Sequence, residues 1–159
     1  ALEEIINLEV WLNKYNPLRG SSYIDLPPVI KQKHAIINVH NTDNRCFMWA
    51  VLSALYPIPD RCLHASRCQK YEPYISTLDF TGIEFPVKLK DVPKFEKLNG
   101  LSINVYGLTE NNNVYPLVIT KEEKSRHIDL MYLTNASSSH YAWIKHLSRL
   151  LSRLYSKYK

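Results

Sequence analysis

The sequence has 159 residues, of which 45% are hydrophobic, and a formal net charge of +5. This is enough apolar material for one compact domain, which we predict to span residues 1–159, and no apolar run reaches the roughly 18 residues of a membrane span. Three cysteines at positions 46, 62 and 68 indicate no disulfide framework, so we expect a protein of the reducing cytoplasm or nucleus. We also expect a monomer.

The first half of the chain predicts two helices and a short strand. Residues 1–16 carry apolar side chains at helical spacing and predict an N-terminal helix that ends at Asn16-Pro17. Residues 35–39, AIINV, predict a short strand, and residues 46–56, CFMWAVLSALY, predict a helix that ends before Pro57. Residues 57–99 lack a long periodic pattern and predict a packed irregular segment with short helices.

The second half predicts a sheet. Strand-like segments cover residues 102–108, 114–119, 128–134 and 140–145, and the intervening stretches ENNN and NASSS are typical of hairpin turns. Together with the preceding helix, this order predicts an α+β fold in which the 46–56 helix packs on an antiparallel sheet.

The last fifteen residues, 145–159, contain five Lys and Arg residues and no acidic residue. Their leucines (Leu147, Leu150, Leu151 and Leu154) repeat at helical spacing, which predicts a basic amphipathic helix lying on the core. A basic helix can also contact phosphates, so DNA binding through this helix is an alternative prediction.

Cys46 has an unusual setting for a structural thiol, because the preceding residues NTDNR are polar. If Asp43 caps the 46–56 helix, Cys46 falls in the first helical turn, where the helix dipole and the unpaired amides favour a thiolate. Cys46 is predicted on the side of this helix opposite its core stripe, which consists of Met48, Val51, Leu52 and Leu55. We therefore predict that Cys46 is a nucleophile.

A thiolate nucleophile needs a base, and His140 is the candidate among six histidines. It follows a turn of small residues and opens a predicted strand, a position from which it can reach the start of a facing helix. A cysteine followed about a hundred residues later by a histidine on an antiparallel strand is the order of papain-like peptidases.

The segment NTDNRCFM resembles the cysteine box of ubiquitin-specific proteases, Asn-x-Gly-Asn-x-Cys-Phe-Met, with Asp43 in place of the glycine. The segment SHYAW resembles their histidine box, in which an aromatic residue follows the catalytic histidine. This resemblance implies a papain-like catalytic domain, a deubiquitinase that cleaves after the C-terminal Gly-Gly of ubiquitin or a ubiquitin-like protein. It also implies that Asn41 stabilises the oxyanion and that Tyr141 narrows the groove for the Gly-Gly end.

Most of the chain also resembles a segment encoded upstream of B-family DNA polymerases in transposable elements. That similarity is carried by KDVPKFEKLNGLSINVYGL and HYAWIKHLSRLLS, and it implies an origin rather than a chemistry. Two alternatives to the deubiquitinase follow from it: a peptidase that processes its own polyprotein, and a non-catalytic module that helps a polymerase bind DNA.

The sequence does not identify the third catalytic residue. The ubiquitin-specific proteases carry it on a strand after the histidine strand, where this chain predicts a helix. Asn38, Asn135 or Asp129 could orient the imidazole of His140, or the site could be a Cys-His dyad. Cys62, His64 and Cys68 match no common four-ligand zinc spacing, so no metal or other cofactor is predicted.

Overall fold

A computed structural model gives the structure of the chain and describes residues 23–59 and 64–152. The predicted N-terminal helix, Cys62 and Leu154 lie outside these residues. The helices are α2 (Pro28–Lys31), α3 (Cys46–Leu55), α4 (Val92–Asn99) and α5 (Leu147–Leu151), with the 3-10 turns η2 (Cys68–Lys70), η3 (Glu72–Thr77) and η4 (Leu89–Asp91). The strands are β1 (Ile36–Ile37), β2 (Ser102–Leu108), β3 (Val114–Val118), β4 (His127–Thr134) and β5 (Ser139–Ile144).

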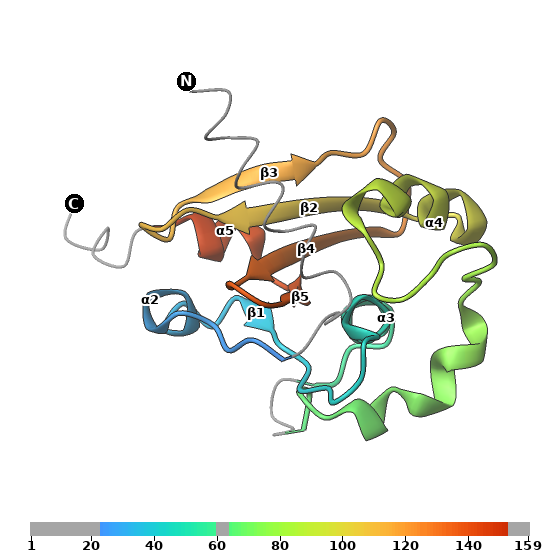
Figure 1. Cartoon of the computed structure of the whole chain (residues 1–159), viewed down its shortest axis with the longest axis horizontal. Helices are drawn as coiled ribbons and strands as arrows, with labels where there is room; N and C mark the ends of the chain where they lie inside the picture. The colour runs from blue at the N-terminus through green and yellow to red at the C-terminus, as the bar shows by residue number, and fades with distance from the viewer. Residues whose placement is uncertain (1–22, 60–63, 153–159) are drawn as a thin grey trace.

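The strands form one five-stranded sheet in the order β1-β5-β4-β2-β3, so the α+β prediction is confirmed (Figure 1). The sheet is not wholly antiparallel, because β2 and β4 are parallel neighbours. The chain makes the β2–β3 hairpin at one edge and then crosses β2 to add β4 on its other side. The prediction of an antiparallel sheet is therefore wrong for this one pair.

Helices cover both faces of the sheet. On one face, α3 and α4 pack against side chains of β2, β4 and β5 in a cluster that includes Phe47, Phe95 and Leu130. On the other face, α2 and α5 pack against β4 and β5 through Ile30 and Leu150. Alternation along β5 therefore sends Tyr141 to the α3 face and Ala142 to the α5 face.

Helix α3 is buried on all sides, whereas the sequence predicted one apolar stripe with Cys46 opposite it. Every residue from Cys46 to Ser53 is buried, because the sheet covers one side of the helix and the segment containing Tyr71 covers another. The polar loop before α3 therefore leads directly into the protein interior.

Helix α5 covers part of the predicted 145–159 helix, of which residues 153–159 lie outside the described residues. It spans Leu147–Leu151, and Ser152 has an extended backbone. Leu150 is fully buried and Leu151 is exposed, while Arg149 donates to the His34 carbonyl at 3.0 Å. Over residues 23–59 and 64–152, no helix is long and apolar enough to cross a membrane.

Candidate active site

The Cys46 thiol lies against the backbone of the histidine strand. Cys46 is the first residue of α3, and its Sγ accepts a hydrogen bond from the Tyr141 backbone N–H at 3.4 Å. Because Tyr141 N is bonded to the carbonyl carbon of His140, Sγ lies within about 6 Å of the His140 Cα. The helix start and the strand start thus bring together two residues that are 94 positions apart in the sequence.

His140 is held by an amide on the neighbouring strand segment. Its Nε2 is 2.6 Å from Oδ1 of Asn38, and Nδ2 of Asn38 donates to the Ile24 carbonyl at 3.0 Å. Since the carbonyl can only accept, it fixes which end of the Asn38 amide faces the imidazole. Nε2 must then carry the proton, and Nδ1 presents its lone pair.

Nδ1 of His140 is buried and has no hydrogen-bond partner among the described residues. Burial, together with the neighbouring His40, lowers the pKa of His140 to about 4. The imidazole is therefore neutral at pH 7, and its one unused atom is a proton acceptor. Buried hydrogen-bond acceptors without a partner are rare in folded proteins, and perturbed titratable groups of this kind are concentrated at active sites.

The other two candidates for the third residue are engaged elsewhere. Asp129 contacts Nε2 of His127 at 2.9 Å, and Oδ1 of Asn135 accepts hydrogen bonds from the amides of Ser137 and Ser138 within its own turn. Of the three residues considered, Asn38 alone contacts His140.

Asp43 does not cap α3, so that prediction is wrong. The residue before the helix is Arg45, and no side-chain cap is formed. Oδ1 of Asp43 accepts from the Arg45 backbone N–H at 3.0 Å, from Nδ2 of Asn41 at 3.1 Å and from Nε1 of Trp49 at 3.2 Å. The indole of Trp49, one turn into the helix, binds the Asp43 carboxylate and keeps it within the 41–45 loop. The helix therefore begins at Cys46, which is its first residue and not the third as predicted.

Asn41 lies in this same loop and is buried. Its Nδ2 donates to the Asp43 carbonyl at 2.7 Å as well as to the carboxylate, while its Oδ1 is buried without a hydrogen-bond partner in the described part of the chain. The amide nitrogen predicted to bind an oxyanion is thus occupied by Asp43 in this structure.

Tyr141 is a core side chain here. It is 2% exposed, its hydroxyl donates to the Val87 carbonyl at 3.0 Å, and its ring meets Phe47 edge to face at 5.0 Å. Burial raises the pKa of Tyr141 well above its usual value, so the phenol stays protonated. In this structure Tyr141 supports the wall behind Cys46 rather than lining an open groove.

Two aromatic neighbours of His140 were not predicted from the sequence. Tyr23 stacks on His40 with ring centroids 3.9 Å apart and meets His140 edge to face at 5.4 Å. No spacing rule links position 23 to position 140. The polar Asn38 inside the apolar run AIINV was the one sequence signal that pointed to a polar contact near His140. The rings cover the imidazole, and with Cys46 only 2% exposed the site is closed.

Cys68 is a useful contrast to Cys46. Its Sγ contacts the His40 carbonyl at 3.3 Å, and burial together with the Asp43 carboxylate raises the pKa of Cys68 to about 11. A thiol with that pKa stays protonated at neutral pH and is a poor nucleophile. In the described ranges, no three His, Cys, Asp or Glu side chains group as metal ligands, and Cys62 falls outside them.

Comparisons with known protein families, with curated proteins and with solved structures found no match. The chemistry of the site therefore rests on its own geometry. That geometry is a thiol at the start of a buried helix, against the backbone of the strand that carries a neutral His140 whose Nε2 is held by an asparagine.

Proposed function

We propose that the chain is a papain-like cysteine peptidase whose catalytic residues are Cys46, His140 and Asn38. The observation that supports it most strongly is the contact between Nε2 of His140 and Asn38, which leaves Nδ1 as a buried lone pair on the strand that the Cys46 thiol touches. Cysteine nucleophiles require such a base, oriented in turn by a third group.

In the proposed reaction, Nδ1 of His140 takes the proton of the Cys46 thiol as Sγ attacks the substrate carbonyl. The imidazolium then protonates the leaving amine, and the acyl group remains on Sγ as a thioester. Water, deprotonated by Nδ1, adds to the thioester carbonyl and releases the carboxylate and the thiol. Asn38 keeps Nε2 protonated throughout, so the lone pair always faces the reacting atoms.

The oxyanion would be bound by the Cys46 backbone N–H, as the first amide of α3, and by the amide of Asn41. Removing one such donor typically costs a hundredfold or more in rate. Because Asn41 donates to Asp43 in the closed site, its use requires a rearrangement of the 41–45 loop when substrate enters.

The proposed substrate is ubiquitin or a ubiquitin-like protein, cleaved after its C-terminal Gly-Gly. This rests on the resemblance of the Cys46 and His140 segments to the boxes of ubiquitin-specific proteases. A peptidase that processes a polyprotein would use the same three residues on another substrate. DNA binding by the basic C-terminal segment gains no support from Arg149, whose guanidinium is held at the His34 carbonyl.

The test is covalent labelling by a ubiquitin probe that carries a C-terminal electrophile. We expect one adduct on the wild-type chain, none on Cys46→Ala, and an unchanged adduct on Cys68→Ala, the matched control. Labelling that persists in Cys46→Ala would refute the nucleophile. A wild type that ignores the ubiquitin probe but reacts with electrophilic peptides through Cys46 would favour the polyprotein substrate.

A further inference from the structure

The candidate active site is covered in this structure. His140 is fully buried and Cys46 is 2% exposed, whereas the proposed reaction needs a substrate carbonyl in contact with Sγ. Part of the cover must therefore move before a substrate can bind. Residues 23–26, which we call the strap, supply one side of this cover.

Tyr23 is the residue of the strap that lies on the imidazole. Its ring meets His140 edge to face with centroids 5.4 Å apart, and it stacks on His40 at 3.9 Å with 16° between the ring planes. Its hydroxyl reaches only as far as Asp25, within the strap, at 3.2 Å and in exposed surroundings. An exposed hydrogen bond competes with water and adds little. The contacts of the ring therefore hold Tyr23 over His140.

Ile24, the next residue, has a different role. Its carbonyl accepts a hydrogen bond from Nδ2 of Asn38 at 3.0 Å, and this contact turns Oδ1 of Asn38 toward Nε2 of His140. Leu26 is 9% exposed and belongs to the core cluster on the α2 and α5 face of the sheet. The strap is thus fixed from Ile24 onward, and rotation of the Tyr23 side chain leaves the Asn38 contact in place.

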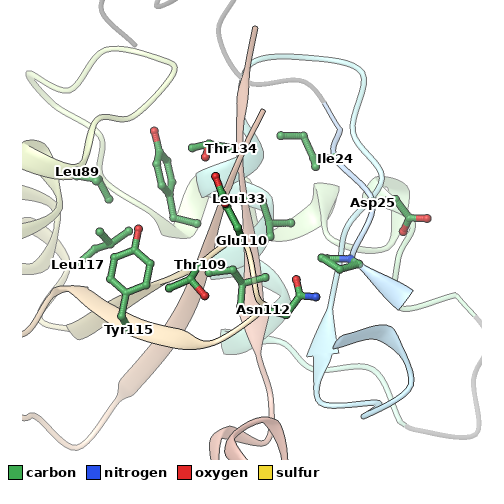
Figure 2. A pocket seen from close by; sticks show the side chains of 13 residues that line it. Ile24, Asp25, Leu89, Thr109, Glu110, Asn112, Tyr115, Leu117, Leu133 and Thr134 are labelled. Atoms are coloured by element: carbon green, nitrogen blue, oxygen red, sulfur yellow. The ribbon is translucent and has the colours of Figure 1, made fainter. Parts of the chain in front are cut away.

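The strap also borders open space. Ile24 and Asp25 form one wall of a pocket of about 510 Å³, and Tyr115 and Leu117 lie across the pocket from them (Figure 2). The strap therefore packs on the core through Leu26 and faces a pocket through Ile24 and Asp25. Its position over the site does not depend on a second packed layer along that wall.

We propose that Tyr23 is a lid on the active site, whose ring closes the site over His140 in the resting chain and rotates away when substrate binds, while Ile24 keeps its contact with Asn38. The inference rests on the proposed peptidase function and adds an autoinhibitory contact to the same site. Because the ring and the substrate compete for the space beside the imidazole, a chain without the ring should react faster than the wild type.

The first test follows His140 by NMR in a chain with isotope-labelled histidines. Burial is the main cause of the low pKa of His140, about 4, and the neighbouring His40 lowers it further. Tyr23→Ala admits water to the imidazole, so the pKa of His140 should rise toward its ordinary value of about 6.5. Tyr23→Phe keeps the ring and should leave this pKa unchanged. The matched control is Tyr74→Ala, which removes a tyrosine that stacks on Tyr56 at 4.0 Å instead of on the site, and it should not alter the pKa of His140.

The second test measures reactivity in the same variants. Diethyl pyrocarbonate acylates neutral imidazoles, and mass spectrometry gives the rate at His140 relative to His146, a histidine outside the strap. We expect Tyr23→Ala to raise this relative rate, and the rate of labelling by the ubiquitin probe, at least about threefold, the scale of an aromatic contact. Tyr23→Phe and Tyr74→Ala should stay within about twofold of the wild type.

The lid would be overturned if the pKa and acylation of His140 were unchanged in a folded Tyr23→Ala chain, or if Tyr74→Ala changed them equally. Probe labelling that is no faster in Tyr23→Ala than in a wild type that labels would also overturn it. Should Tyr23→Ala fail to fold, Tyr23→Leu removes the ring with a smaller loss of apolar surface and carries the same expectations. The pKa and acylation of His140 need no substrate, so a rise in both without probe labelling of any variant would retain the closure by Tyr23 and count against the proposed deubiquitinase.

Discussion

Replacing Asn38 with alanine tests the catalytic assignment most directly. The change removes the acceptor 2.6 Å from Nε2 of His140 and the donor to the Ile24 carbonyl. An imidazole without this partner can put its proton on Nδ1, and that tautomer cannot accept the proton of the Cys46 thiol. We therefore expect Asn38→Ala to fold and to lose most of its activity.

The size of the loss follows from the bond that is removed. Leaving a buried polar group unsatisfied costs about 1–3 kcal/mol. If that free energy is lost from the transition state, the rate falls by about 5- to 150-fold, at 1.36 kcal/mol per tenfold. The assay is the single-turnover rate of probe labelling, with urea denaturation of the same sample to measure stability.

Two companion variants make the result interpretable. Asn135→Ala removes an asparagine of similar chemistry from an exposed turn and should label at the wild-type rate. Asn38→Asp places a carboxylate beside Nε2, which favours the imidazolium, so the pKa of His140 should rise from about 4 and the acid limb of kcat/KM should move to higher pH. Wild-type labelling by a folded Asn38→Ala chain would show that Asn38 is not a catalytic residue.

Three further outcomes are expected. Asp43→Ala should lower the free energy of unfolding by about 1–3 kcal/mol in urea titrations, because the 41–45 loop loses its shared acceptor, and a loss below 0.5 kcal/mol would contradict that role. His140 has a pKa near 4 in the folded chain and about 6.5 when unfolded, so the unfolded state binds more protons between these values. Stability should therefore fall by up to about 3 kcal/mol as the pH drops from 6.5 to 4, and His140→Asn should flatten the part of this fall between pH 6.5 and 5. Tyr141→Phe should cost about 1–2 kcal/mol of stability through the Val87 carbonyl and leave labelling intact, whereas a selective loss of labelling would assign the hydroxyl a role at the site.

The elements of the fold were well predicted because their signals are local. The apolar run CFMWAVLSAL is α3, and the strand-like segments at 102–108 and 128–134 match β2 and β4 to within one residue. Helix and strand periodicities are properties of neighbouring residues, so the chain itself carries them.

The pairing of strands and the capping of α3 could not be predicted in the same way as the elements. They depend on which of several competing partners a strand or side chain finds in the folded chain. Nothing in residues 102–134 distinguishes a β4 that returns antiparallel beside β3 from one that crosses β2 and pairs with it in parallel. Asp43 follows the sequence pattern of a cap, but the Trp49 indole and the Asn41 amide compete for the same carboxylate.

Local patterns were enough to predict the α+β class and to single out Cys46 and His140, since a thiol after polar residues and a histidine opening a strand are signals among neighbouring residues. Which of Asn38, Asn135 and Asp129 contacts His140 is visible only in the folded chain. The pairing of β1 with β5 sets Asn38 beside His140, and this contact spans 102 residues that no periodic pattern connects. The structure likewise buried Tyr141 and closed the site with Tyr23, because packing against distant side chains depends on the whole fold.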